Sequence, residues 1–409
     1  MSEFQILIVC GSPVALSELS PDARRALAFA RLLGREFRVA LAAPGARDLA
    51  DSESFERMNW AERQAFASAR FDLGIAGVND FGGRWIPFAS RWIADIWRLD
   101  SYRAFCAARA GALVDWLWLR RAQRKAMRAL RKAQFLLCAS GPQLDFWIGG
   151  LYATGRFRDR LPYGAEHLND LGAFVPFGWD DAFEKAADAG AAPPQASEPA
   201  IVWADALDEH LDPYTAIRAV KRVARERPGT RLAIPVEDDE QGLRPSAGRG
   251  APASVRAYAR AQGALNECVT LAPGAVADIP RLLAGAQLAI SLSGHPLENR
   301  YSFRTRLLEC LRTGTPLVCV EGGFWGEFVT EHGIGRTAPM GDSDAVAAAI
   351  LSALDPHAQD QCRANMAKAR EALRWERAAA PLAQFCRREQ RRIRAAKEAP
   401  HPNKQPSAA

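Results

Sequence analysis

Short apolar runs separated by helical stretches occupy the first part of the chain. The runs lie at residues 5–10, 37–43, 71–77 and 134–139, and the stretch 20–34 between the first two has helical spacing. Runs that are apolar throughout are typical of strands buried on both faces of a parallel sheet. The order strand, helix, strand predicts a βαβ unit at the start of the chain.

The same alternation restarts after residue 199. Strands are predicted at 200–206, 231–236, 269–272, 287–293 and 316–320, and helices near 213–226, 252–263, 324–332 and 342–354. Residues 181–199 between the two halves are rich in Ala, Pro and Gly, which predicts a linker. The chain is therefore expected to be an α/β protein with two Rossmann-like, doubly wound domains facing a cleft. Ligands in such sheets bind at the carboxyl ends of the strands.

A long helical pattern ends the chain. It runs from about Asn365 to Lys397 and closes in the basic sequence RREQRRIR, and a polar tail that we expect to be disordered follows. The chain has 409 residues and a net charge of +6, whereas two basic segments, 115–134 and 387–409, carry net charges of +6 and +5, which leaves −5 for all other residues. The remaining body is mildly acidic, which argues against a nucleic-acid-binding protein.

Several classes of protein are excluded by pattern. The eight cysteines include no C-x-x-C pair, so we expect neither a zinc site nor a disulfide framework. The start MSEFQILIVCGSP does not resemble a signal peptide, and no apolar run approaches the roughly 20 residues of a membrane-spanning helix. We therefore expect a cytoplasmic protein, and the bias toward Ala and Arg indicates a GC-rich bacterial gene.

Residues 291–323, SLSGHPLENRYSFRTRLLECLRTGTPLVCVEGG, carry the most chemistry. Ser302 is predicted to cap a helix that starts at Phe303 and ends at Gly314. Arg304 and Arg306 would then lie in the first turn, where the helix dipole disfavours cations unless an anion binds there. The alternative is that both arginines pair with local acids, such as Glu298 or Glu309.

The pattern E-x-x-x-S-F-R-T-R-L-L-E-C-L-x-x-G-T-P-L-V, followed by a Gly pair and EFVTEHGIG, resembles the donor-binding half of group-1 glycosyltransferases of the family-4 type, which have the GT-B fold. Segments 20–33, 138–156 and 201–234 are similar to other parts of these enzymes. The resemblance implies an acceptor domain at 1–180, the linker at 181–199 and a nucleotide-sugar-binding domain at 200–374. It further implies a helix at 375–398 that crosses back to the first domain, ahead of a tail at 399–409.

What the resemblance implies is sugar transfer from a nucleotide-sugar to a glycan or lipid-linked acceptor in envelope polysaccharide assembly, with retained configuration and with neither an essential metal nor a cofactor. Ser302, Phe303 and Arg304 would face the diphosphate together with Arg306. Glu309 would contact the ribose. Glu298 would be the catalytic residue near the sugar.

Two departures from the family pattern leave a second hypothesis open. Tyr301 stands where the family has an acid, and Ala204, Asp205 and Ala206 replace a glycine-rich turn. The alternative is a catalytically inactive, glycosyltransferase-like binding or scaffold protein. A nucleotide-sugar epimerase on the same fold is a third and weaker hypothesis.

In the first domain, Gly11 follows the first strand, and Asp22 and Arg24 begin the next helix. These residues are acceptor-side candidates, with an exposed helix start as the alternative. His295 and His167 are the histidines nearest to the candidate cleft loops, although a lone histidine is more often structural or merely exposed.

Tryptophans and cations alternate between residues 84 and 134. Trp116 and Trp118 precede the helical sequence LRRAQRKAMRALRKAQ, which predicts either a helix on an anionic membrane surface or a domain helix with a solvated basic face and core tryptophans. A crossing terminal helix would place the basic segment 387–409 on the same side of the molecule as 115–134, which would suit peripheral contact with the inner face of the membrane.

Overall fold

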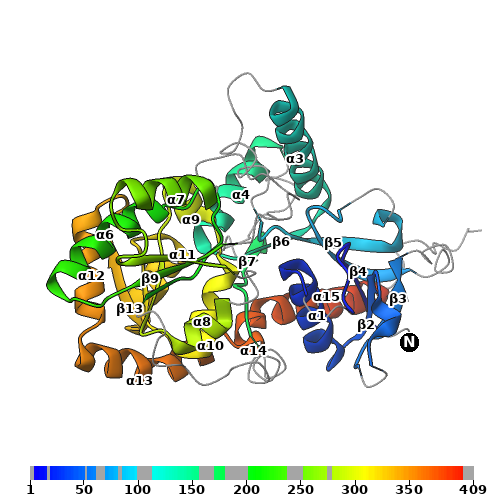
Figure 1. Cartoon of the computed structure of the whole chain (residues 1–409). Coiled ribbons are helices and arrows are strands. Elements are labelled where there is room, and N and C mark those ends of the chain that lie inside the picture. Colours follow the sequence, from blue (N-terminus) through cyan, green and yellow to red (C-terminus); the bar gives the residue numbers. More distant parts are fainter. Residues whose placement is uncertain are drawn as a thin grey trace, which may run out of the picture.

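The computed structural model has two α/β domains side by side (Figure 1). It describes residues 4–15, 19–50, 53–60, 70–81, 85–98, 113–155, 170–179, 201–236, 252–273 and 279–398. The predicted linker at 181–199, the predicted tail at 399–409 and His167 lie outside the described residues. The predicted fold class, two parallel sheets with helices on their faces, is confirmed.

The first domain is built on a seven-stranded parallel sheet in the order β3-β2-β1-β4-β5-β6-β7. Its strands are β1 (Gln5–Val9), β2 (Arg38–Ala43), β3 (Glu56–Asn59), β4 (Phe71–Gly77), β5 (Ala89–Asp95), β6 (Phe135–Cys138) and β7 (Gly172–Phe174). Its helices are α1 (Pro21–Gly34), α3 (Leu113–Lys132) and α4 (Gly141–Ala153). Strands β3, β5 and β7 were not predicted, since none of them is a continuous apolar run.

Alternate side chains of β1 enter different core clusters, as the two-residue period of a strand requires. Ile6 and Ile8 pack in one cluster with residues of α1 and of the end of the chain. Leu7 and Val9 pack in another with residues of α3 and α4. Helix α1 and helix α3 therefore cover opposite faces of this sheet.

The second domain has a six-stranded parallel sheet in the order β10-β9-β8-β11-β12-β13. Its strands are β8 (Ile201–Trp203), β9 (Leu232–Val236), β10 (Val269–Pro273), β11 (Leu288–Ser291), β12 (Leu317–Val320) and β13 (Gly335–Ala338). Its helices are α6 (Pro213–Glu226), α7 (Pro252–Ala261), α8 (Ile279–Gly285), α9 (Pro296–Tyr301), α10 (Leu308–Thr313), α11 (Gly323–His332) and α12 (Ser343–Ala353).

The expected single helix over 365–397 is wrong. The structure has α13 (Pro356–Ala372), α14 (Trp375–Ala378) and α15 (Ala380–Glu398) instead. The break falls where the chain passes between the domains, because the backbone there pairs with Trp179. The Trp179 N–H donates to the Leu373 carbonyl at 3.0 Å, and the Trp375 N–H donates to the Trp179 carbonyl at 3.2 Å.

Helix α15 crosses back to the first domain, as expected. The ring of Phe385 stacks on that of Phe135 with centroids 4.0 Å apart. Ion pairs join Arg91 to Glu389 and Glu36 to Arg387. The core clusters place α15 on the α1 face of the sheet, so the expectation that both basic segments share one side of the molecule is wrong.

Within the described residues, no helix is both long enough and apolar enough to span a membrane.

Candidate functional site

The second sheet has a topological switch point between β8 and β11. From β8 the chain continues to β9 on one side, whereas β11 pairs with β8 on the other side. Connections that leave a sheet in opposite directions open a crevice at the carboxyl ends of the strands, where α/β proteins bind ligands. The first part of the segment 291–323, which the sequence singled out, lies at this edge of the sheet, because it follows the end of β11 and its Arg304 contacts Ser291 and Asp205.

The side chain of Arg304 is part of a buried polar cluster at the switch point. Its Nη1 donates to the Ser291 hydroxyl at 2.8 Å and lies 3.8 Å from the Asp205 carboxylate. Ser291 also donates to Asp205. The side chains of Arg304 and Asp205 are 9% and 7% exposed, so each compensates the other's buried charge. The alternative drawn from the sequence, pairing with a local acid such as Glu298 or Glu309, is wrong for Arg304, because its acidic partner Asp205 is distant in sequence.

The predicted helix start at Ser302 and Phe303 is wrong. Ser302 is the C-cap of α9, with its N–H donating to the Glu298 carbonyl at 2.9 Å. The chain is then extended as far as Arg304, and a single 3₁₀ turn (Thr305–Leu307) precedes α10. Tertiary packing overrides the local capping signal, because Phe303 is buried against Phe177 and Phe324. Neither Ser302 nor Phe303 thus presents a helix N-terminus to a ligand.

Glu298 is buried in α9 and faces a histidine from the loop after β8. His210 Nε2 lies 3.3 Å from Glu298 Oε1 and 4.0 Å from an Asp208 oxygen. Glu298 is only 4% exposed. The sequence had favoured His295 and His167 as cleft histidines. His210 follows the carboxyl end of β8, and that position was the available signal for it.

Arg306 and Glu309 have different surroundings. Arg306 is half-buried, and within the described part of the chain no ion pair or hydrogen bond engages its guanidinium. Glu309 forms an ion pair with Arg312, whose Nε lies 2.6 Å from Glu309 Oε2. Arg306 is therefore available to an anion, and Glu309 is held in one orientation by its neighbour.

A glycine pair, Gly322 and Gly323, forms the start of α11 just after β12. Both residues have positive φ, +70° at Gly322 and +61° at Gly323. A Cβ on Gly323 would lie 2.0 Å from the Asn299 carbonyl oxygen. The Asn299 side chain donates to the Glu321 carbonyl at 2.8 Å. Gly323 is thus required for the close approach of α9 to the start of α11.

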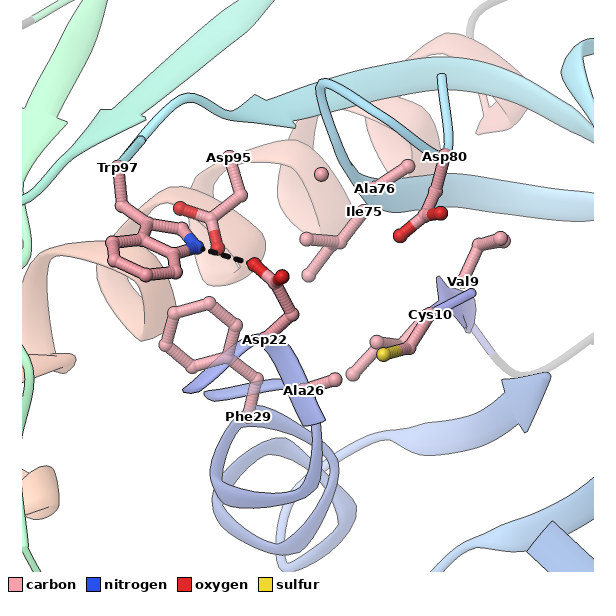
Figure 2. A pocket seen from close by; sticks show the side chains of 12 residues that line it. Val9, Cys10, Asp22, Ala26, Phe29, Ile75, Ala76, Asp80, Asp95 and Trp97 are labelled. Atoms are coloured by element: carbon pink, nitrogen blue, oxygen red, sulfur yellow. Dashed lines mark hydrogen bonds between the residues drawn. The ribbon is translucent and has the colours of Figure 1, made fainter. Parts of the chain in front are cut away.

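The first sheet also has a switch point, between β1 and β4. A small cavity of about 20 Å³, enough for about one water molecule, lies at this edge. In Figure 2, Asp22 and Asp80 point into the same space from different elements. Asp22 accepts hydrogen bonds from Trp97 Nε1 at 2.9 Å and from Arg98 at 3.0 Å. Its carboxylate therefore orients the wall of the cavity.

Asp80 was not predicted, although its neighbour Gly11 was. Burial raises the pKa of the Asp80 carboxyl to about 6, a hydrogen bond from the Gly11 backbone acts against this shift, and Asp22 adds to it. A Cβ on Gly11 would lie 2.4 Å from Asp80 Oδ1. Gly11 is therefore needed so that this carboxylate can approach the end of β1. The sequence signal was the loop GVND directly after a buried strand.

Arg24 and Arg25 are neighbours near the start of α1 and differ in burial. Arg24 is exposed, while Arg25 is 1% exposed and forms a buried ion pair with Asp95 at 2.7 Å. Burial raises the pKa of Asp95, and Arg25 acts against that shift. Arg24, the acceptor-side candidate, does not line the cavity.

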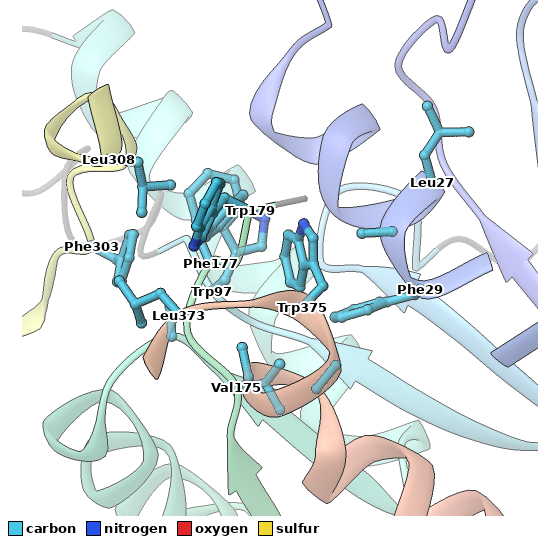
Figure 3. Packing of buried hydrophobic residues seen from close by; sticks show 14 of the residues in the cluster. Leu27, Phe29, Trp97, Val175, Phe177, Trp179, Phe303, Leu308, Leu373 and Trp375 are labelled. Atoms are coloured by element: carbon cyan, nitrogen blue, oxygen red, sulfur yellow. The ribbon is translucent and has the colours of Figure 1, made fainter. Parts of the chain in front are cut away.

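The two sites are joined through the domain interface. The side chain of Gln143 on α4 donates to the carbonyls of Trp97 and Tyr301, at 3.0 and 2.5 Å. Figure 3 shows Phe177 and Phe303, one from each domain, in one apolar cluster with Trp375. The segment that carries Trp97 and the end of α9 at Tyr301 therefore share a packed interface.

Residues 214–356 match the family model for glycosyl transferases group 1, and no curated protein matches the chain in sequence. Sucrose-phosphate synthase from Thermosynechococcus elongatus has a similar structure, with a TM-score of 0.62 at 15% identity over 96% of this chain and 100% of that one. Anabaena HepE in complex with UDP gives a TM-score of 0.58 at 14% identity, over 94% of this chain and 100% of its own. A glycosyltransferase from Rickettsia africae gives 0.59 at 10% identity, covering 95% and 99%.

These similarities extend over nearly the whole chain at low identity, which shows a shared architecture. Together with the two parallel sheets and the returning α15, they establish the fold that the sequence predicted. The chain therefore has the GT-B fold, and its C-terminal domain matches the glycosyl transferases group 1 over residues 214–356.

Proposed function

We propose that the protein is a cytoplasmic glycosyltransferase of the family-4 type. It transfers a sugar from a nucleotide-sugar to a glycan or lipid-linked acceptor in cell-envelope polysaccharide assembly. The observation that supports this best is the switch point of the second sheet, where Arg304 meets Asp205. Two residues further along, Arg306 has no partner within the described residues. HepE, which is similar over 94% of this chain, was solved with UDP.

Arg306 is the cation that we assign to the donor diphosphate. The leaving nucleoside diphosphate gains negative charge in the transition state, and a guanidinium beside it stabilises that charge. Arg304 acts differently. Its ion pair with Asp205 holds the loop that carries Arg306, so we assign Arg304 a positioning role.

Glu309 and Glu298 keep the roles that the resemblance implied, as proposals. One oxygen of Glu309 is held by Arg312, which leaves the other for a ribose hydroxyl. Glu298 next to His210 supplies a carboxylate near the sugar. Retention of configuration and independence from metal ions belong to the same proposal.

Calorimetric titration with UDP and other nucleoside diphosphates tests donor binding. Arg306→Ala should weaken binding by about 10- to 100-fold, since a charge-assisted hydrogen bond contributes roughly 1.5–3 kcal/mol. Arg260→Ala is the matched control, because Arg260 is exposed at the end of α7. If the wild-type protein binds no nucleoside diphosphate or nucleotide-sugar, the proposal is wrong.

Transfer itself is tested by nucleotide release from a nucleotide-sugar in the presence of a glycan or lipid-linked acceptor. Activity should be unchanged in EDTA, and the anomeric coupling constant of the product should show retention. Glu298→Gln should reduce turnover and leave UDP affinity near that of the wild type.

The second candidate is an inactive, glycosyltransferase-like binding protein. The observation that favours it is that Arg304 and Glu309 already have protein partners, and that Asp205 lies where the family has a glycine-rich turn. Nucleotide binding without release of sugar to any acceptor tested would select this candidate.

A further inference from the structure

The first half of α3 carries large apolar side chains that no described residue covers. Trp116 is 48% exposed, Leu117 is 53% exposed and Trp118 is 50% exposed. In Figure 1, α3 extends away from the rest of the first domain. Two tryptophans and a leucine in one turn form an apolar tip on a helix that is otherwise highly charged.

The second half of α3 is anchored in the core. Ala126, Ala129 and Leu130 are at most 3% exposed and belong to the cluster on this face of the first sheet. The helix is therefore a fixed part of the domain, and its orientation is set by packing against β5 and α4. The apolar tip is held rigidly away from this anchor.

Cations run along the exposed side of the same helix. They are Arg120, Arg121, Arg124, Arg128 and Arg131. From Arg120 to Arg131 the stripe is roughly 16 Å long at 1.5 Å per residue. Within the part of the chain that the structure describes, none of them forms an ion pair. Arg120 stacks over the ring of Trp116, 4.5 Å from its centroid.

The basic end of α15 differs in two respects: three of its arginines form ion pairs, although Arg391 and Arg392 form none within the described residues, and it carries no tryptophan. Arg387 pairs with Glu36, Arg388 pairs with Asp170, and Arg394 pairs with Glu398. Its large apolar residues, such as Phe385, are buried against the first sheet. Both α3 and the basic end of α15 are positively charged, so charge alone does not distinguish them. Only α3 combines unpaired arginines with exposed tryptophans.

We propose that this α3 surface, from Trp116 to Arg131, binds membranes that contain anionic lipid. Indole rings are most stable at the boundary between headgroups and acyl chains, because one part of the ring is apolar and the other donates a hydrogen bond. A straight row of arginines matches the even negative charge of a lipid surface, and their long side chains reach headgroups while the tip enters the interface. A protein partner would need a matching acidic groove at each arginine, and a lipid surface needs none.

Sedimentation with vesicles tests the proposal on the full chain, without nucleotide. The wild-type protein should bind vesicles made of equal parts phosphatidylglycerol and phosphatidylcholine, and should stay in solution with phosphatidylcholine alone. Binding should weaken as salt is raised, because the attraction is screened. Arg121→Glu/Arg124→Glu should lower binding by roughly 30-fold or more, given the contribution of each cation near an anionic surface.

Arg391→Glu/Arg392→Glu on α15 is the matched control, with the same change of charge on the opposite face of the sheet. It should bind as the wild type does. Trp116→Ser/Trp118→Ser separates insertion from charge and should lower binding by about tenfold. The altered side chains are exposed, so thermal unfolding should be unchanged in all variants.

Three results would overturn the proposal. These are no binding of the wild-type protein to anionic vesicles, equal loss in the α3 and α15 charge variants, and unchanged binding of the α3 charge variant. If the wild-type protein binds UDP and does not bind anionic vesicles, the proposed membrane binding by α3 is wrong. The proposed transferase activity is then unaffected.

Discussion

Gln143 in the first domain donates a hydrogen bond to the backbone carbonyl of Tyr301 in the second, at 2.5 Å. The same amide nitrogen donates to the carbonyl of Trp97, and the amide oxygen accepts from the Ala139 N–H at 2.7 Å. Gln143 is fully buried, so one of its two amide hydrogens has an acceptor only while the domains are in contact. The Tyr301 carbonyl therefore helps to join the two domains.

Gln143→Leu should lower the free energy of unfolding by about 2 kcal/mol, because two buried carbonyls lose their donor. Urea unfolding measures this. Asp145→Asn on the exposed side of the same helix is the control and should be nearly neutral. Equal stability of the two variants would mean that water replaces the Gln143 amide at the interface.

Arg304→Met should cost about 3–5 kcal/mol, because it leaves the Asp205 carboxylate buried without a counter-charge. Adding Asp205→Asn to this variant should restore part of the loss. Urea unfolding of the single and double variants measures the coupling. A double variant no more stable than the Arg304→Met single variant would contradict the assigned pairing.

Gly323→Ala should destabilise the protein by about 3 kcal/mol or more, since a Cβ would meet the Asn299 carbonyl at 2.0 Å and the residue has a φ of +61°. Gly341→Ala provides the comparison, because Gly341 has a φ of +76° with no heavy atom near the added Cβ. It should cost about 1 kcal/mol, from backbone strain alone. Thermal unfolding measures the loss of stability in each variant. A similar loss in Gly323→Ala and Gly341→Ala would show that α9 can shift away from α11 at little cost.

Asp80→Asn should stabilise the protein above pH 6. The folded-state pKa of Asp80 is raised to about 6 from 3.8, so the wild-type protein loses stability relative to the variant as pH rises between these values. Below about pH 4 the two should differ little, since the carboxyl is then protonated in both states. At pH 7 the gain should be about 1–3 kcal/mol. Urea unfolding of both proteins across this pH range measures the difference in stability. If Asp80→Asn is less stable than the wild type at pH 7, burial of the Asp80 carboxylate does not destabilise the protein as inferred.

Much of the fold followed from the sequence because buried parallel strands have a local signature. Runs such as residues 5–10 and 316–320 are apolar throughout, and β1 and β12 lie within them. The short β7 has no such signature, and it forms a strand by pairing with the edge of β6. The long terminal helix failed as a prediction because a backbone pairing with Trp179, far away in the chain, interrupts it.

The sequence predicted which segment carries the candidate site, but not the conformation or the partners of its residues. The start of the segment 291–323 does lie at the switch point, where Arg304 meets Ser291 and Asp205. Ser302 nevertheless fails as a helix cap, because burial of Phe303 at the domain interface outweighs a single capping hydrogen bond. His210 and Asp80 were missed, since only the folded chain brings them to Glu298 and Gly11.

The sequence by itself determined the two α/β domains, the segment that carries the candidate site and the presence of two basic segments. Each of these depends on local periodicity or composition, which neighbouring residues encode. The tertiary structure alone decided that Arg304 pairs with Asp205, that α15 covers the opposite face of the sheet from α3, and that Trp116 and Trp118 stay exposed while Trp92 is buried. Ion pairing and burial depend on which distant side chains the fold brings within a few ångströms, and that distance is not encoded in any local stretch of the chain.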